Sequence, residues 1–167
     1  EGKNIAALDR AAGRLHVPVR AAGPMEGPNG TRIELAHVEA LGTLGDTFLS
    51  AIYGARPVYA SPALYEPFGL SVLEAAQAGC ALLLSDIPTY REIWGGAAIF
   101  VPPNDDAALA AAVCDLLNDP DEREQLGQLA RARAQHYRPE RMARGMAHIY
   151  ASIASPVRTS AEMAGAA

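Results

Sequence analysis

The sequence predicts an α/β protein built on a doubly wound parallel sheet with helices on both faces. Short apolar segments alternate with segments of helical spacing over most of the chain. One apolar segment, residues 81–85, has no polar position before its last residue, which is typical of a strand covered on both faces. Half of the 167 residues are apolar and a fifth are charged, as in ordinary globular domains.

The first six segments follow from spacing and from turn residues. Apolar positions three and four apart predict the first helix, which ends near Gly13, and a segment rich in Gly, Pro and Asn must be a loop. Asp46 is expected to cap the second helix, with Phe48, Leu49 and Ile52 on its inner face. The second strand ends at Gly42, and the first half of its segment could instead be helical. In order, we expect a helix at 4–14, a strand at 17–22, a loop at 23–32, a strand within 33–41, a helix at 47–54 and a strand at 57–60.

Helix signals dominate the rest of the chain. Gly79 is expected to stop one helix, and Asn104 or Asp105 to cap another. Asp119 precedes a proline and stands three residues before Glu122, which is typical of a helix start. We expect a helix at 69–78, strands at 81–85 and 97–101, a helix at 88–94 between them, and helices at 105–117, from 120 and at 139–153. Residues 1–153 are therefore predicted to form one domain, and 154–167 a flexible tail.

Composition excludes several classes of function. The net charge is −5 and the 14 Lys and Arg residues are scattered, so a nucleic-acid-binding face is not expected. There is no spaced Cys/His set for a metal, and Cys80 and Cys114 are expected to be small buried side chains. The longest apolar stretch is too short to span a membrane. We expect a cytoplasmic protein. Because the chain opens on Glu-Gly-Lys-Asn and runs directly into a helix, we also expect it to be a piece of a longer one.

The segment 61–79 carries the chemistry. Glu66 and Glu74 stand eight positions apart across a Pro-Phe-Gly-Leu turn, between a strand and a helix. Free N–H groups at a helix start hold phosphate or other electron-rich oxygens, and here they belong to Phe68, Gly69, Leu70 and Ser71. Gly69 lets a ligand come close to the backbone, and a carboxylate one turn into the helix suits the two hydroxyls of a ribose. Either glutamate alone would be an ordinary solvated acid. The combination predicts a pocket for a sugar attached to a nucleotide diphosphate.

These motifs resemble the retaining glycosyltransferases of the GT-B fold, in the large group 1 (family 4) that includes sucrose and glycogen synthases and bacterial mannosyltransferases. The resemblance runs from residue 1 to about 152 and is strongest over 57–103. Its motifs are Glu66 and Glu74 with seven residues between them, Ala-Gly-Cys-Ala at 78–81, Ser-Asp-Ile-Pro at 85–88, and the Glu92 segment before Val-Pro-Pro at 101–103. It implies that the chain is a Rossmann-like, C-terminal donor-binding domain.

The resemblance also implies residue roles. Glu66 would contact the transferred sugar as the catalytic residue, Glu74 would bind the ribose, and Lys3 would bind the diphosphate. The loop after Gly42 would hold the base. Backbone groups of the turn would hold sugar hydroxyls or phosphate, in the segment that comprises Phe68, Gly69, Leu70 and Ser71.

The implied reaction uses a UDP-, GDP- or ADP-sugar and an acceptor hydroxyl, with no metal or bound cofactor. The acceptor would bind an N-terminal domain that this chain lacks, and the missing domain could also place the protein at the membrane surface. The first, central strand of the sheet is expected to be missing and to be supplied by another chain. The isolated chain is therefore expected to have no transferase activity. A sugar-nucleotide epimerase, a phosphorylase and a nucleotide-binding module without catalysis stay open as alternatives.

Overall fold

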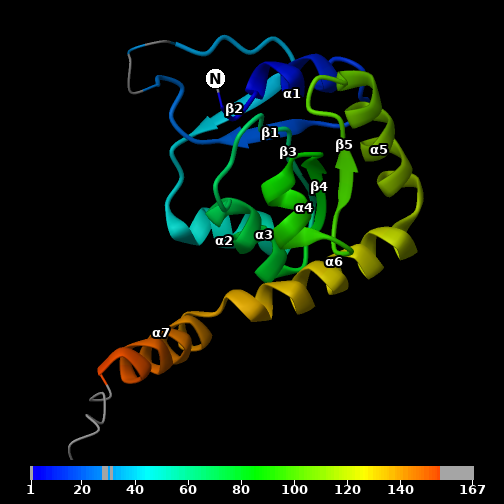
Figure 1. Ribbon diagram of the computed structural model, residues 1–167. Helices are drawn as coiled ribbons and strands as arrows, with labels where there is room; N and C mark the ends of the chain where they lie inside the picture. The colour runs from blue at the N-terminus through cyan, green and yellow to red at the C-terminus, as the bar shows by residue number, and fades with distance from the viewer. Residues whose placement is uncertain (1, 28–29, 31, 155–167) are drawn as a thin grey trace, which may run out of the picture. The chain divides into compact units, whose positions relative to one another are not determined.

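The computed structural model describes residues 2–27, 30 and 32–154 of the chain. These residues fall into two compact units, Glu1–Gln135 and His136–Ala167, and each is considered by itself. The first unit is an α/β structure with parallel strands, as the sequence predicts (Figure 1).

The described strands of the first unit form two parallel sheets. One pairs β1 with β2, and the other has the order β3-β4-β5. The strands are β1 (Val19–Ala22), β2 (Val38–Gly42), β3 (Val58–Ser61), β4 (Ala81–Ser85) and β5 (Ile99–Val101). We expected one doubly wound sheet without its central strand. Two separate sheets are what such a sheet would leave, and the supply of that strand by another chain stays a prediction.

Strand β4 is the centre of the hydrophobic core. All five of its residues are buried, as predicted for a strand covered on both faces. Leu83 packs in one cluster with helices α1 (Ile5–Ala12) and α5 (Asp106–Asn118). Side chains alternate along a strand, so Leu82 and Leu84 point to the opposite face. Helices α3 (Leu70–Ala78) and α6 (Pro120–Ala134) pack against β4 and against each other.

Local capping confirms several predicted boundaries. Gly79 ends α3 in the left-handed conformation, with φ 86°. The Asp105 carboxylate accepts a hydrogen bond from the Ala108 N–H, and the Asp119 carboxylate accepts one from the Glu122 N–H. Each carboxylate satisfies an amide that has no partner inside its helix, so α5 and α6 begin where the sequence predicts.

Three expectations were wrong. Helix α2 (Asp46–Gly54) is capped by Gly45, and Asp46 lies in its first turn, where its charge still favours the helix dipole. Phe48 is 70% exposed, whereas Leu49 and Ile52 are half-buried as predicted, together with Tyr53. Cys80 is buried as expected, but Cys114 lies on the exposed side of α5. The remaining helix of the first unit is α4 (Pro88–Trp94), within its predicted bounds.

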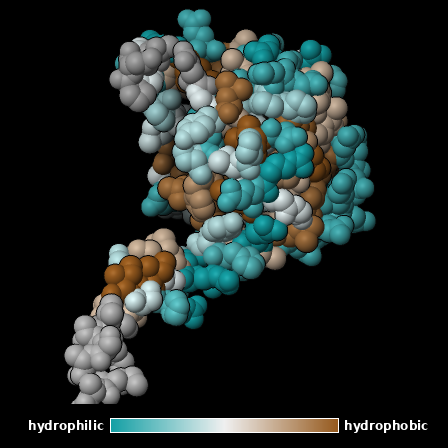
Figure 2. Space-filling view, viewed as in Figure 1, coloured by the Kyte–Doolittle hydropathy of each residue, from teal (hydrophilic) through white to brown (hydrophobic). Residues whose placement is uncertain are grey.

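The second unit contains the helix α7 (Pro139–Ala154), after a short 3₁₀ turn at Gln135–Tyr137. Exposed large apolar side chains recur along one side of this helix, at Met142, Met146, Ile149, Tyr150 and Ile153. Figure 2 shows brown, hydrophobic atoms gathered on α7. The predicted tail falls almost wholly outside the described residues. Among the described helices, none is long and apolar enough to cross a bilayer.

Candidate functional site

Glu66 lies in the loop that follows β3, at the carboxyl edge of the three-stranded sheet. Ligands of open α/β sheets bind at this edge. The Glu66 side chain is only 12% exposed and forms an ion pair with the Lys3 ammonium group, which is 71% exposed. The backbone links the same two segments, because the Leu64 N–H donates to the Gly2 carbonyl at 2.9 Å. Residues 63 positions apart therefore meet as one charged pair beside the sheet.

Gly69 lies close to the side chain of Glu66. Its φ of 86° is in the left-handed region that favours glycine, and the residue is buried. A Cβ at this position would stand 3.0 Å from Val72 Cγ2 and 3.4 Å from both Glu66 Cγ and Tyr90 Cε1. Helix α3 begins immediately after Gly69, so its first N–H groups lie next to the Glu66 loop. Phe68 is half-buried, and the Leu70 side chain is 69% exposed.

Three hydroxyl contacts lie in and around this loop, and one of them, from Thr89, reaches its backbone. Thr89 Oγ1 donates to the Glu66 carbonyl at 2.8 Å, and the Tyr90 and Ser61 hydroxyls lie 2.7 Å apart. Tyr59 donates from its hydroxyl to Ser71 Oγ at 2.9 Å. Burial and then the Glu66 charge raise the pKa of Tyr90, against the hydrogen bond with Ser61 that lowers it. The loop is therefore held at its backbone, while the Glu66 carboxylate stays available to Lys3.

Glu74 lies one turn further along α3 and is exposed. Burial and then the Glu74 charge raise the pKa of Tyr53. Burial also raises the pKa of Tyr59, to which Glu74 adds a smaller electrostatic effect. The Glu74 carboxylate therefore acts electrostatically on both phenols, and Glu74 is exposed.

Gly42 lies apart from this group of residues. It ends β2 in the other sheet, with φ 65°, and its carbonyl accepts the Gly23 N–H at 2.8 Å. It therefore shares with Glu66 a place at the carboxyl end of a strand, and its proposed link to a base stays a prediction.

Sequence reasoning assigned no role to Asn4, Thr89 or Tyr90. Asn4 Nδ2 donates to the carbonyl oxygens of Pro62 at 3.0 Å and Pro103 at 2.7 Å. These partners are 58 and 99 residues away, and the Thr89 contact spans 23 residues. No local pattern signals such contacts.

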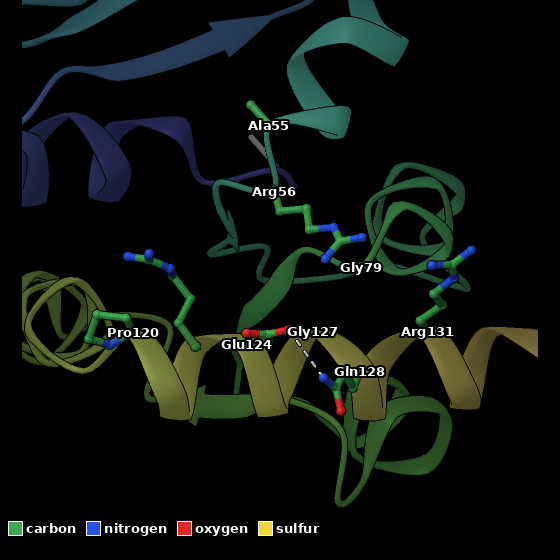
Figure 3. Close-up of a pocket in the computed structure, with 9 residues that line it drawn as sticks. Ala55, Arg56, Gly79, Pro120, Glu124, Gly127, Gln128 and Arg131 are labelled. Carbon is green, nitrogen blue, oxygen red and sulfur yellow. Dashed lines mark hydrogen bonds between the residues drawn. The ribbon is translucent and has the colours of Figure 1, made fainter.

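A cavity of about 290 Å³ lies at the other edge of the sheet. Arg56 and Gly79 precede the amino ends of β3 and β4, and Figure 3 shows Glu124, Gln128 and Arg131 on the face of α6 that borders them. A site at the amino ends of the strands is not where an open α/β sheet binds its ligand. Among the described residues no group of His, Cys, Asp and Glu could hold a metal ion.

The parallel strands, the Gly69 turn and the loop that carries Glu66 together define the class of this unit as an open α/β domain. Residues 32–133 match the family described as Glycosyl transferases group 1, and the chain belongs to this family.

Two relatives illustrate the match. The O-antigen chain mannosyltransferase B of Escherichia coli is 33% identical over 87 residues, which cover 52% of this chain and 23% of that protein. The glycogen synthase of Mycobacterium tuberculosis is 40% identical over 95 residues, covering 56% and 23%. The chain thus spans about a quarter of the length of the curated relatives it matches.

Solved structures support the fold. Sucrose-phosphate synthase from Thermosynechococcus elongatus superposes with a TM-score of 0.78 at 26% identity, over 91% of this chain and 42% of that one. Anabaena HepE, solved in complex with UDP-glucose, gives a TM-score of 0.77 at 18% identity over 90% and 46%, which bears on the fold alone. The architecture is that of the C-terminal Rossmann-like domain of GT-B glycosyltransferases, as the sequence predicts.

Proposed function

We propose that this chain is the donor-binding domain of a retaining glycosyltransferase, which transfers a hexosyl group from a nucleotide-diphospho-sugar to an acceptor hydroxyl. The observation that carries the proposal is the ion pair of Lys3 and Glu66 directly beside the start of α3. It supplies a cation for the diphosphate and a carboxylate for sugar hydroxyls, next to helix N–H groups that favour anions.

Each residue would have a distinct role. Lys3 and the N–H groups at the start of α3 would stabilise the charge that develops on the leaving diphosphate. Glu66 would accept hydrogen bonds from the transferred sugar and orient it, while Glu74 would accept those of the ribose. The loop after Gly42 would hold the base, and no metal or cofactor would be required.

Nucleotide binding tests the donor site. We expect UDP, GDP or ADP to bind the protein in calorimetric titrations, and the Lys3→Met and Glu74→Gln variants to bind it about tenfold more weakly, as loss of a charged hydrogen bond predicts. Glu124→Gln, at the opposite edge of the sheet, is the matched control and should bind normally. Equal affinity in all three variants would contradict this placement of the site.

Activity tests the reaction. The relatives are named as mannosyl- and rhamnosyltransferases and as glycogen synthase, so GDP-mannose, UDP-glucose and ADP-glucose are the first donors to assay. In the full-length protein we expect transfer with an unchanged anomeric configuration in the NMR spectrum of the product, and loss of transfer in Glu66→Gln. An inverted product would refute the retaining assignment.

The rest of the protein would bind the acceptor, since this chain spans only about a quarter of its relatives. We therefore expect the 167-residue chain alone to show no transfer, and turnover by it would overturn that expectation. Release of sugar by inorganic phosphate would indicate a phosphorylase, and conversion of the donor sugar without an acceptor an epimerase. We also propose that the protein is cytoplasmic and that any membrane contact is made by the rest of the protein. Cell fractionation tests this location.

A further inference from the structure

We propose that Asn4 is a positioning residue of the donor site: its side-chain amide fastens the segment that carries Lys3 to the loops after β3 and β5, and thereby holds Lys3 against Glu66. The inference rests on the proposed function, and it adds a residue that neither the motifs nor the family match assigns.

The backbone of Asn4 is the first observation. Its φ is 52°, and among the described non-glycine residues only Arg56 shares a positive φ. This left-handed conformation is unfavourable for residues with a Cβ, although asparagine tolerates it better than most. The conformation turns the chain between Lys3 and the first residue of α1.

The second observation is what the side chain does there. Asparagine is among the best N-cap residues because its carbonyl accepts an N–H of the first helical turn. Asn4 occupies the N-cap position of α1 but makes no such bond. Its amide nitrogen donates instead to Pro62 and Pro103, at 3.0 and 2.7 Å. Both partners are carbonyl oxygens, so only the nitrogen end of the amide can face them.

The two partners belong to the loops that shape the carboxyl edge of the sheet. Pro62 follows β3 and is buried, four residues before Glu66, and Pro103 follows β5. On the other side of Lys3, the Gly2 carbonyl accepts the Leu64 N–H. Lys3 is thus held on both sides by bonds to the segment that leads into Glu66. A long, exposed ammonium side chain then needs little further ordering to meet its partner.

Two substitutions separate this role from helix capping. Asn4→Gly keeps the left-handed backbone and an acceptable cap but removes both donors. Asn4→Asp has nearly the same shape and is an excellent cap, but it places a carboxylate oxygen against two carbonyl oxygens. A positioning role predicts that Asp is worse than Gly, whereas a capping role predicts the reverse. Asn104→Gly is the control, because it lies beside Pro103 and its side chain makes no hydrogen bond within the described part of the chain.

The experiment is a double-variant cycle in the full-length protein, with UDP, GDP or ADP as the probe. We expect Asn4→Gly to raise the Kd about fivefold and Asn4→Asp to raise it more, while Asn104→Gly leaves it unchanged. In a Lys3→Met background, Asn4→Gly should have no further effect, because Asn4 acts through Lys3. Independent, multiplicative effects of the two substitutions would overturn the proposal.

A second readout does not depend on any ligand. Hydrogen exchange at the Leu64 amide should be faster in Asn4→Gly and Asn4→Asp, and unchanged in Asn104→Gly, because the bond to Gly2 closes the same segment. If the wild-type protein binds none of the nucleotides, the proposed function fails. The exchange rate of the Leu64 amide still tests whether Asn4 positions the segment that carries Lys3. Unchanged exchange at Leu64 in both Asn4 variants would refute this positioning role.

Discussion

Replacing Gly69 by alanine should damage both stability and donor binding, and the structure separates the two effects. The φ of 86° is unfavourable for alanine by about 1–2 kcal/mol. The new Cβ would also stand 3.0 Å from Val72 Cγ2, closer than ordinary contact, and 3.4 Å from Glu66 Cγ and Tyr90 Cε1. Overpacking of this kind costs roughly 1 kcal/mol when one side chain can shift.

Gly96 provides the matched control. Its φ of 77° carries nearly the same conformational cost, but nothing lies within 4 Å of a Cβ built there. Gly96→Ala should therefore lose about 1–2 kcal/mol and Gly69→Ala about 2–3 kcal/mol. In thermal unfolding followed by circular dichroism, these losses correspond to roughly 2–8 °C and 4–12 °C for a chain of this size.

Donor binding should distinguish the two alanine variants more sharply than stability does. The Cβ at position 69 can be accommodated only by moving Val72 or the Glu66 and Tyr90 side chains. Displacement of Glu66 by a few tenths of an ångström should weaken nucleotide-sugar binding by about tenfold in titration calorimetry. Gly96→Ala should leave binding unchanged. If both variants lose the same stability and both bind normally, then Gly69 serves only its backbone conformation, and the reasoning about space beneath Glu66 is wrong.

Three further predictions rest on other contacts. Gly127→Ala would place a Cβ 2.2 Å from the Gly79 carbonyl oxygen, in the turn between α3 and β4. We expect urea unfolding to show a loss of about 2 kcal/mol, although alanine has the better helix propensity. The same change at Gly145, where nothing lies within 4 Å of the new Cβ, should cause no loss. Partial desolvation raises the pKa of Asp9, but three backbone N–H bonds outweigh it and set the pKa below its ordinary value. The stability that Asp9 adds relative to the Asp9→Asn variant should then be complete above about pH 5 and disappear as the pH falls through that lowered pKa. Unfolding curves of both proteins at several pH values measure this difference, and a difference that stays constant with pH would contradict the prediction. Thr89→Val removes the hydroxyl bound to the Glu66 carbonyl and should weaken donor binding about fivefold with little change of Tm; normal affinity would show that this bond does not position the loop.

The part of the fold that depends on local chemistry could be predicted from the sequence. Gly79, Asp105 and Asp119 act within three or four residues of themselves, so the ends of α3, α5 and α6 are encoded where they occur. The uninterrupted apolar run of β4 likewise reports burial on both faces. The prediction for α2 was right for Leu49 and Ile52 but wrong for Phe48, because the edge of the buried face depends on distant packing partners that α2 does not encode.

The candidate site divides along the same line. The strand–turn–helix arrangement around Glu66, Gly69 and Glu74 could be predicted because the three residues stand within nine positions of the sequence. Lys3 was reached only through the resemblance, and nothing nearby in sequence indicates its partner 63 residues away. Asn4 could not be predicted because its two partners, the carbonyl groups of Pro62 and Pro103, lie in separate loops that come together only when the sheet has formed.

Glu66 and Lys3 are held in place by different parts of the fold. The loop that carries Glu66 is bound at its backbone by Thr89 of α4, and the neighbouring Tyr90 bonds to Ser61 at the end of β3, so this part of its support does not involve Lys3. The cation, by contrast, reaches the loop only through a short segment before α1 whose fixed points are Gly2 and Asn4. Since charge-assisted bonds weaken steeply with misplacement, we expect the segment before α1 to limit the affinity for a diphosphate more than the loop that carries Glu66 does. Substitutions that loosen that segment should therefore weaken binding of the nucleotide diphosphate, whereas substitutions around Glu66 should weaken chiefly the recognition of the sugar.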